Sequence, residues 1–148
     1  MIHIEKNTLT APQFHTLYTA VGWDAPEICQ IERALAHSMA VFSAYDDADP
    51  SCPVGMVRLL GDGGMSFYLK DFAVLPSYQH NGIGSLLMEA VAETIHAMLE
   101  EDWAVSLECI STPDAVPFYE RHGFAPRPNE WDGPGMLRML RKTAEETK

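Results

Sequence analysis

The feature that most limits the fold of this sequence lies between residues 65 and 110. There the residue pattern changes from that of a strand to that of a helix and then back to that of a strand. Residues 65–75 have the composition of a strand, and residues 82–101 carry apolar side chains at the spacing of an amphipathic helix. Residues 104–110, "AVSLECI", are again rich in side chains that favour strands. A strand, a helix and a second strand in this order predict two parallel strands joined by a right-handed crossover.

Two helices are predicted before this central part. Thr10 and Gln13 have the spacing of a capping box, so a short amphipathic helix should follow them. Asp24 and Glu27 repeat that spacing, which predicts a second helix that runs to about residue 38. Both helices would bury one apolar stripe against a common core.

Further strands are predicted on both sides of the central part. Before residue 65 we expect strands at residues 2–5, 39–45 and 54–60, the last two joined by the polar turn "DDADPSCP". A short helix over residues 115–122 and two more strands are expected toward the end of the chain. The predicted fold is α/β, with a mixed, mostly antiparallel, twisted sheet of six to seven strands flanked by about four helices.

Composition limits the function before any motif is considered. The chain has 148 residues and a net charge of −11, which fits one globular domain over residues 1–148 and disfavours nucleic acid as a partner. No run approaches the roughly 18–20 apolar residues of a membrane span, and a signal-peptide pattern is absent, so we expect a cytoplasmic protein without membrane attachment. The histidines and cysteines have no metal-binding spacing, so no metal is expected.

Two glycines, Gly82 and Gly84, lie where the central strand gives way to the helix, in "QHNGIG" at residues 79–84. Glycine lets the backbone approach a ligand closely, and the start of a helix offers unpaired N–H groups and a partial positive charge to an anion. A P-loop is excluded because no lysine follows, and the dinucleotide fingerprint fails because Leu87 stands at its third glycine position. The residues therefore predict a backbone phosphate site of another kind.

Two segments of the chain carry a resemblance to a known family. Residues 79–84 are similar to the Q/R-x-x-G-x-G/A pyrophosphate loop, and "VPFYERHGF" at residues 116–124 is similar to the FYxxxGF segment, of the GNAT superfamily of N-acetyltransferases. The resemblance covers most of residues 1–142. It implies a central parallel strand pair that splays apart to admit acetyl-CoA.

The same resemblance implies which residues bind acetyl-CoA. Main-chain groups of Phe72, Ala73 and Val74 would contact the pantetheine arm and the acetyl oxygen. The side chains of Phe72 and Val74 are explained equally well as ordinary core residues of a strand. The pyrophosphate would be bound by Gln79, His80, Asn81, Gly82, Ile83, Gly84 and Ser85.

Three residues are candidates for the chemistry. Tyr119 matches the tyrosine of the FYxxxGF segment, which implies that it protonates the leaving thiolate. Glu108 lies where some relatives carry a general base, although a solvated or ion-paired glutamate explains it equally well. Asp71 is a second candidate base of nearly equal rank, and strict strand alternation would place it on the opposite face from Tyr68 and Lys70.

The function inferred from the sequence is transfer of an acetyl group from acetyl-CoA to a primary amine by direct attack, through a tetrahedral intermediate. The acceptor would be a small cationic amine or a peptide N-terminus, and the fold does not choose between them. Two alternatives stay open, a non-catalytic regulatory module that binds acetyl-CoA and an acyltransferase that uses a longer acyl-CoA. Dimers are common in this family, so a homodimer is among the expected assemblies.

Overall fold

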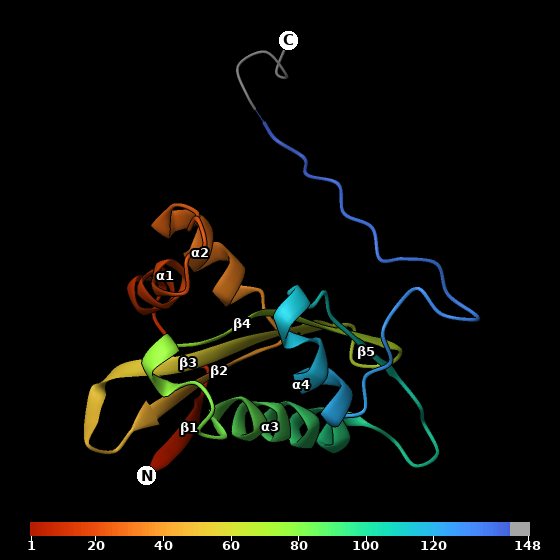
Figure 1. Cartoon of the computed structure of the whole chain (residues 1–148), viewed down its shortest axis with the longest axis horizontal. Helices are drawn as coiled ribbons and strands as arrows, with labels where there is room; N and C mark the ends of the chain where they lie inside the picture. The colour runs from red at the N-terminus through yellow and green to blue at the C-terminus, as the bar shows by residue number, and fades with distance from the viewer. Residues whose placement is uncertain (143–148) are drawn as a thin grey trace. The chain divides into compact units, whose positions relative to one another are not determined.

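The computed structural model describes residues 1–142, and the chain divides into two compact units, Met1–Cys109 and a second that begins at Ile110. The first unit is built on a five-stranded sheet with the order β1-β2-β3-β4-β5 (Figure 1). All neighbouring strands are antiparallel except β4 and β5, which are parallel. The predicted mixed sheet with one parallel pair is confirmed. The strands are β1 (Ile2–Lys6), β2 (Ala40–Asp46), β3 (Asp49–Gly61), β4 (Ser66–Val74) and β5 (Ser106–Glu108).

Helices cover both faces of this sheet. Helices α1 (Ala11–Ala20) and α2 (Ile28–Ala36) lie on one face, and α3 (Ile83–Met98) lies on the other (Figure 1). The α1/α2 layer packs on the sheet through a buried cluster that includes Phe14, Leu17, Met56 and Ala73. The α3 layer buries one apolar stripe, made of Ile83, Leu87, Val91 and Ile95. The junction between β4 and α3 is therefore held from both sides.

The predicted capping box of α1 is present, whereas the predicted start of α2 is wrong. Thr10 accepts a hydrogen bond from the Gln13 backbone N–H, and Gln13 accepts one from the Thr10 N–H. Helix α2 begins only at Ile28, with Glu27 at its N-cap and no side-chain cap, so Asp24 stays outside the helix. Pro26 explains the delay, because a proline disfavours helical geometry in the residue before it.

The turn between β2 and β3 is much shorter than the predicted eight-residue loop "DDADPSCP". Strand β3 begins at Asp49, and Asp46 pairs with Asp49, so only residues 47 and 48 make the turn. Prolines 50 and 53 lie within the strand, beside register shifts near Tyr45. Proline is tolerated in strands at such irregularities, where its missing N–H breaks no ladder bond.

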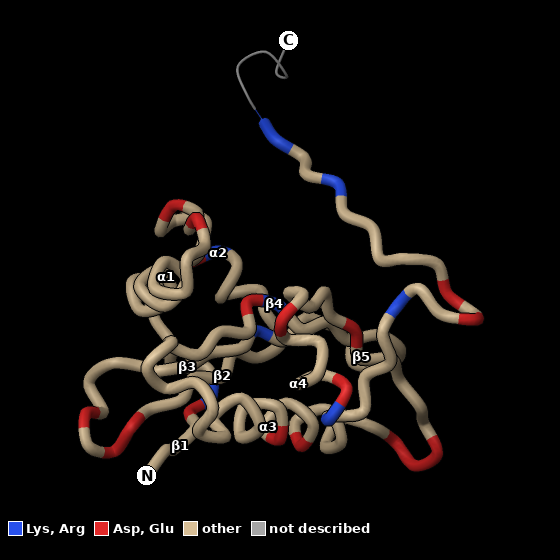
Figure 2. The backbone as a smooth tube through the Cα atoms, in the orientation of Figure 1, with Lys and Arg blue, Asp and Glu red and all other residues tan. Residues whose placement is uncertain are grey.

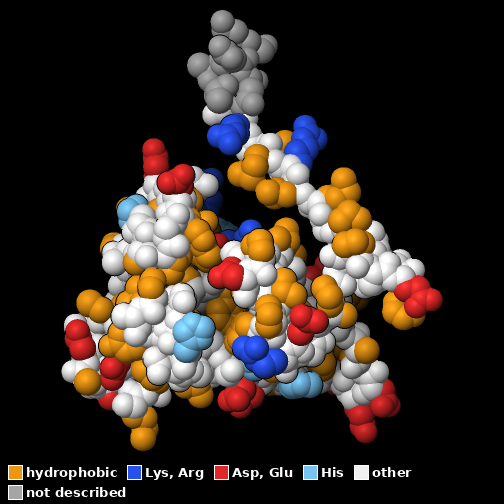
Figure 3. Space-filling model, viewed as in Figure 1, with side chains coloured by type: hydrophobic (Ala, Val, Ile, Leu, Met, Phe, Trp, Pro, Cys, Tyr) orange, Lys and Arg blue, Asp and Glu red, His pale blue; other side chains and the backbone are white. Residues whose placement is uncertain are grey.

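The second unit contains the short helices η2 (Pro113–Ala115) and α4 (Val116–Arg121). The two strands predicted after Gly123 are absent from residues 124–142, which is why the described sheet has five strands. Apolar side chains of this stretch are instead exposed, with Met136 at 88% and Leu140 at 76% of their full exposure (Figure 3). A strand exists only where a neighbour completes its hydrogen-bond ladder, and this stretch has no such neighbour among residues 110–142.

Candidate functional site

The β4–α3 loop is held in a tight shape by its own residues. It opens with the short helix η1 (Pro76–Tyr78) and contains two residues in the left-handed region, His80 with φ 64° and Gly82 with φ 79°. The Gln79 side-chain amide donates to the Val74 carbonyl at 3.1 Å, and the Asn81 amide donates to the Tyr78 and Gln79 carbonyls. The predicted loop residues therefore form one structured turn whose amide side chains bind the loop itself.

A second contact ties this loop to the sheet. The Tyr78 hydroxyl donates to the Asp46 carboxylate at the end of β2, with 3.0 Å between the oxygens. This bond raises the pKa of the Tyr78 hydroxyl. The pKa of Asp46 is lowered, first by the backbone N–H of Ala48 and second by Tyr78. The loop is thus anchored at both ends before α3 begins.

Helix α3 starts at Ile83 without any cap from a side chain. Gly82 is its N-cap residue, and no acidic residue lies in the first turn. A Cβ atom built on Gly82 would meet no heavy atom within 4 Å, so the space in front of the helix start is open. The buried side chains of Ile83 and Leu87 fix the first turn on the sheet. An open helix start of this kind favours an anionic group such as a phosphate.

The distribution of charged residues is consistent with an anion site at the start of α3. Residues 72–88 contain no Asp or Glu, although the chain has 21 acidic residues. Acidic residues lie instead on the turn between β2 and β3 and on the segment that follows α3 (Figure 2). An anion at the start of α3 would therefore meet no acidic side chain from the loop that binds it.

Strand β5 pairs with β4 only at the end of β4 that lies away from this loop. Their pairing runs through Ser66 with Ser106, Phe67 with Leu107 and Tyr68 with Glu108, and within residues 1–142 it ends there. Strand β4 continues to Val74. The Leu75 N–H donates to the Val54 carbonyl of β3, and the neighbouring Val74 carbonyl points the other way, where Gln79 binds it.

The predicted pantetheine-binding residues lie on this last part of β4. Ala73 is buried in the α1/α2 cluster, while Phe72 and Val74 are half-buried. The Ala73 side chain therefore serves the core, and the ligand role of residues 72–74 stays a prediction. Residues 72–74 lie on the part of β4 that is not paired with β5.

Glu108 lies directly beside Tyr68 at the last paired position of β4 and β5. Both residues line a surface hollow of about 320 Å³ at this end of the sheet. Burial raises the pKa of the Tyr68 hydroxyl, with smaller contributions from the negative charges of Cys109 and Glu108. The remaining lining residues are Leu60, Gly61, Asp62, Ser66 and Phe67.

Asp71 does not lie where strict alternation predicted. Its carboxylate accepts a hydrogen bond from Arg58 Nε at 2.8 Å, and Arg58 pairs across the sheet with Lys70. Asp71 has φ 56°, and a register shift in the β3–β4 pairing lies at this position. The prediction that Asp71 and Lys70 point to opposite faces is therefore wrong, because a β-bulge turns the Asp71 side chain toward Arg58.

Sequence reasoning missed Arg58 altogether. Its guanidinium joins Asp71 to Ser38, which follows α2, through a 3.4 Å contact from Nη1 to the Ser38 hydroxyl. The signal that could have found it is a charged residue inside the apolar strand sequence "VGMVRLL". A charge in such a position is costly unless it is paired.

Tyr119 lies in α4, in the second unit. Its ring makes edge contacts with Phe118 and Phe124, with centroid distances of 5.3 and 5.4 Å. Its carbonyl accepts the N–H groups of His122 and Phe124, and Gly123, with φ 89°, ends the helix. The tyrosine is thus held by local packing, and its role as the acid stays a prediction.

Residues 1–142 contain neither a side-chain cluster that could hold a metal ion nor a helix that could span a membrane. No group of three or more His, Cys, Asp or Glu side chains is placed to hold a metal ion. No helix in that part of the chain is both long enough and apolar enough to cross a bilayer.

Comparison with known proteins decides the family. The model of the acetyltransferase (GNAT) domain matches residues 37–126, from the end of α2 through α4. The chain belongs to the GNAT acetyltransferases. Its structure is similar to a probable acetyltransferase of Staphylococcus aureus, with a TM-score of 0.80 and 31% identity over 95% of this chain and 100% of that one. It is also similar to a GNAT family acetyltransferase of Streptococcus pneumoniae, with a TM-score of 0.75 and 36% identity over 96% and 100%.

Curated GNAT relatives include two plant proteins. The chain is 29% identical over 133 residues to GCN5-related N-acetyltransferase 1, chloroplastic, of Arabidopsis thaliana, which covers 90% of this chain. It is 32% identical over 124 residues to serotonin N-acetyltransferase 2, chloroplastic, of Oryza sativa, which covers 82% of this chain. The chain spans 65% of the Arabidopsis protein and 60% of the rice protein. Because both relatives are named chloroplastic, the cytoplasmic location stays a prediction.

Proposed function

We propose that this GNAT protein transfers an acetyl group from acetyl-CoA to the primary amine of a small cationic molecule or of a peptide N-terminus. The observation that carries the proposal is the open start of α3, which follows left-handed Gly82 and the part of β4 that β5 does not pair with. A backbone anion site that follows a strand segment without a β5 partner fits a ligand with a pyrophosphate at one end and an extended arm. Coenzyme A has this form.

Each residue has a defined task in the proposed reaction. Glu108 takes a proton from the amine, and the amine nitrogen then attacks the thioester carbonyl carbon. Main-chain groups of residues 72–74 bind the acetyl oxygen as it gains negative charge. The carbon–sulfur bond breaks, and Tyr119 protonates the thiolate that leaves. The nitrogen gives up its second proton to the Tyr119 oxygen, and Glu108 releases the first proton to solvent. The products are the amide and free coenzyme A.

The acceptor is proposed from charge and from the hollow beside Glu108. A carboxylate and the ring of Tyr68 line the same hollow, and both favour a cationic ammonium group. An amine would arrive protonated and lose its proton to Glu108. Because one relative at 32% identity is named a serotonin N-acetyltransferase, arylalkylamines belong in the first set of acceptors to be tested.

Titration calorimetry with acetyl-CoA tests the binding site. In Gly82→Val, the β-branched side chain disfavours the left-handed conformation and crowds the open space before α3. We expect its Kd for acetyl-CoA to rise at least about tenfold, equivalent to about 1.4 kcal/mol. Gly22→Val is the matched control, because Gly22 is also left-handed and open at its Cβ position but follows α1. If a folded wild type binds no acetyl-CoA, the proposal fails.

Release of free thiol tests the reaction and separates the alternatives. Wild type would be incubated with acetyl-CoA and a set of amines that includes serotonin, polyamines and peptides with free N-termini. Turnover of at least one amine supports the enzyme. Binding of acetyl-CoA without any turnover would favour the regulatory module instead, and faster turnover with a longer acyl-CoA would favour the other acyltransferase.

A further inference from the structure

Arg58 and Asp71 form a largely buried ion pair on the α1/α2 face of the sheet. Arg58 Nε lies 2.8 Å from Asp71 Oδ2, and the two side chains are only 15% and 10% exposed. Arg58 also donates to the Ser38 hydroxyl, which itself donates to the Ala34 carbonyl of α2 at 2.7 Å. One guanidinium thus connects the end of α2, strand β3 and strand β4.

The pair lies at a bulge in β4. Met56 pairs with Ala73 and Arg58 pairs with Lys70, so Val57 alone lies opposite both Asp71 and Phe72. Asp71 takes the left-handed conformation, with φ 56°, that lets a strand accept the extra residue. A residue other than glycine stays in this region only where its surroundings hold it there.

We propose that Arg58 is a positioning residue for acetyl transfer, which holds Asp71 in the bulge and so sets the direction of the main chain at residues 72–74. This inference rests on the proposed function. It gives Asp71 a structural task in place of the predicted role of base, so Glu108 alone remains as the candidate base.

The physical reason is that Asp71 needs Arg58 as its partner to stay in its present position. Without Arg58, the Asp71 carboxylate would be buried and unpaired, which strongly disfavours its present position. The carboxylate would turn toward water, and the backbone of the bulge would turn with it. Residues 72–74 follow the bulge directly, and small displacements of groups that orient a substrate reduce turnover more than they reduce binding.

Three variants test the inference. Arg58→Met removes the partner, and we expect kcat to fall at least about tenfold with the KM for the amine changed less than about threefold. The double variant Arg58→Met/Asp71→Gly has no buried carboxylate and a residue that adopts positive φ freely. We expect it to recover kcat to within about threefold of wild type. His3→Gln, which removes another charged contact of the sheet, should leave kcat unchanged.

The backbone amide NMR signals of residues 72–74, recorded without acetyl-CoA or amine, give a readout that does not need activity. We expect these signals to move in Arg58→Met and to return in the double variant. If Arg58→Met does not fold, Arg58→Lys keeps the charge but loses the forked donors, and it should displace the same signals and lower kcat at least about threefold.

Two results would overturn the inference. One is a variant at Arg58 with wild-type amide signals and wild-type kcat. The other is loss of turnover in Asp71→Asn and in the double variant while the amide signals stay as in wild type, because Asp71 would then act chemically. A wild type that binds no acetyl-CoA and turns over no amine is a different failure, since it contradicts the proposed function while the amide signals still report on the bulge.

Discussion

Tyr119 differs from its neighbour Phe118 by one hydroxyl group, and that group carries its proposed role as acid. Tyr119→Phe keeps the ring contacts with Phe118 and Phe124. We expect kcat to fall about 100-fold, the lower end of what general acids contribute, with the Kd for acetyl-CoA within about twofold of wild type. Tyr45→Phe, on β2, controls for the loss of a tyrosine hydroxyl elsewhere. Unchanged turnover in Tyr119→Phe would remove the assignment.

Glu108 is the residue whose replacement should change how the rate depends on pH. If it accepts the proton of the amine, its carboxylate is needed for the reaction. We expect Glu108→Gln to lower kcat/KM about 100-fold and to change the shape of the pH–rate profile. The exposed Glu93→Gln on α3 should leave the profile unaltered. An unaltered profile and unaltered kcat/KM in Glu108→Gln would assign the base to another group.

At the scale of single elements, the capping box of α1 gives a measurable contribution to stability. Thr10→Ala removes the acceptor for the Gln13 N–H, which lies 3.3 Å from the threonine oxygen. We expect a loss of about 1 kcal/mol in the free energy of unfolding, seen in urea titration. Thr16→Ala, in the middle of the same helix, should cost nothing, because alanine is the better helix former. Equal losses in both variants would show that the cap contributes nothing specific.

The elements also show how far the sequence predicts this fold. Periodicity found α3 and the capping box found α1, because both signals are local. The β-bulge at Asp71 and the early start of β3 were missed, since each depends on a partner elsewhere in the chain. The start of α2 was missed although its cause, Pro26, is a local signal. The pairing of Arg58 with Lys70 and of Met56 with Ala73 across the sheet, for example, decides that Asp71 occupies a bulge. Strand-like residues at 124–142 have no neighbouring strand among residues 110–142 and form no strand there.

At the scale of the whole molecule, the candidate site also divides into parts that have a local sequence signal and parts that depend on contacts between distant residues. The loop at residues 79–84 was found because glycine spacing before a helix is a local signal. Glu108 was found through the resemblance, and the structure adds its neighbour Tyr68 and the hollow that both line. Arg58 was missed because its importance comes from contacts with Ser38 and Asp71, which are distant in sequence. The charge inside the apolar strand sequence marks Arg58 as unusual, but one sequence does not show which residue it pairs with.

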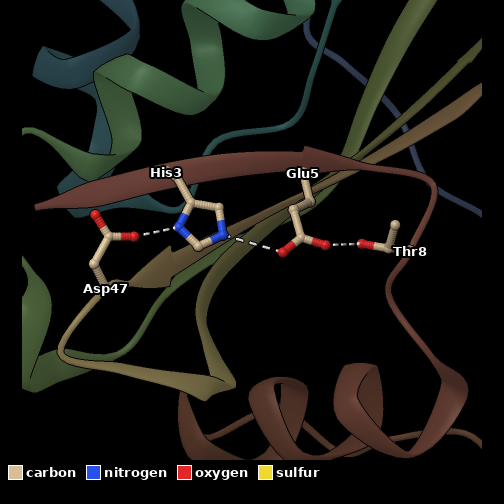
Figure 4. A network of polar contacts seen from close by, with 4 residues as sticks. All are labelled: His3, Glu5, Thr8 and Asp47. Atoms are coloured by element: carbon tan, nitrogen blue, oxygen red, sulfur yellow. Dashed lines mark hydrogen bonds and ion pairs between the residues drawn. The ribbon is translucent and has the colours of Figure 1, made fainter.

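One long-range network also links the ends of β1 and β2 and makes stability depend on pH (Figure 4). His3 Nδ1 lies 2.6 Å from the Asp47 carboxylate, and His3 Nε2 lies 3.1 Å from Glu5, which also accepts the Thr8 hydroxyl. The His3 ring stacks on Tyr45. Hydrogen bonds to Glu5 and then to Asp47 raise the pKa of His3 above its ordinary 6.5. Hydrogen bonds from Thr8 and then from His3 lower the pKa of Glu5 below its ordinary 4.5.

The directions of these two shifts fix the pH window in which the network stabilises the protein. The contribution of His3 is complete below pH 6.5 and is lost as pH rises through its higher folded pKa. The contribution of Glu5 is complete above pH 4.5 and is lost as pH falls through its lower folded pKa. We therefore expect urea titrations to show the largest stability difference between wild type and His3→Gln from about pH 4.5 to 6.5. Asp47→Asn should reduce that difference, because it removes one of the two negative charges that attract protonated His3. A difference that grows from pH 6 to pH 9 would contradict the network, since deprotonated His3 no longer attracts either carboxylate.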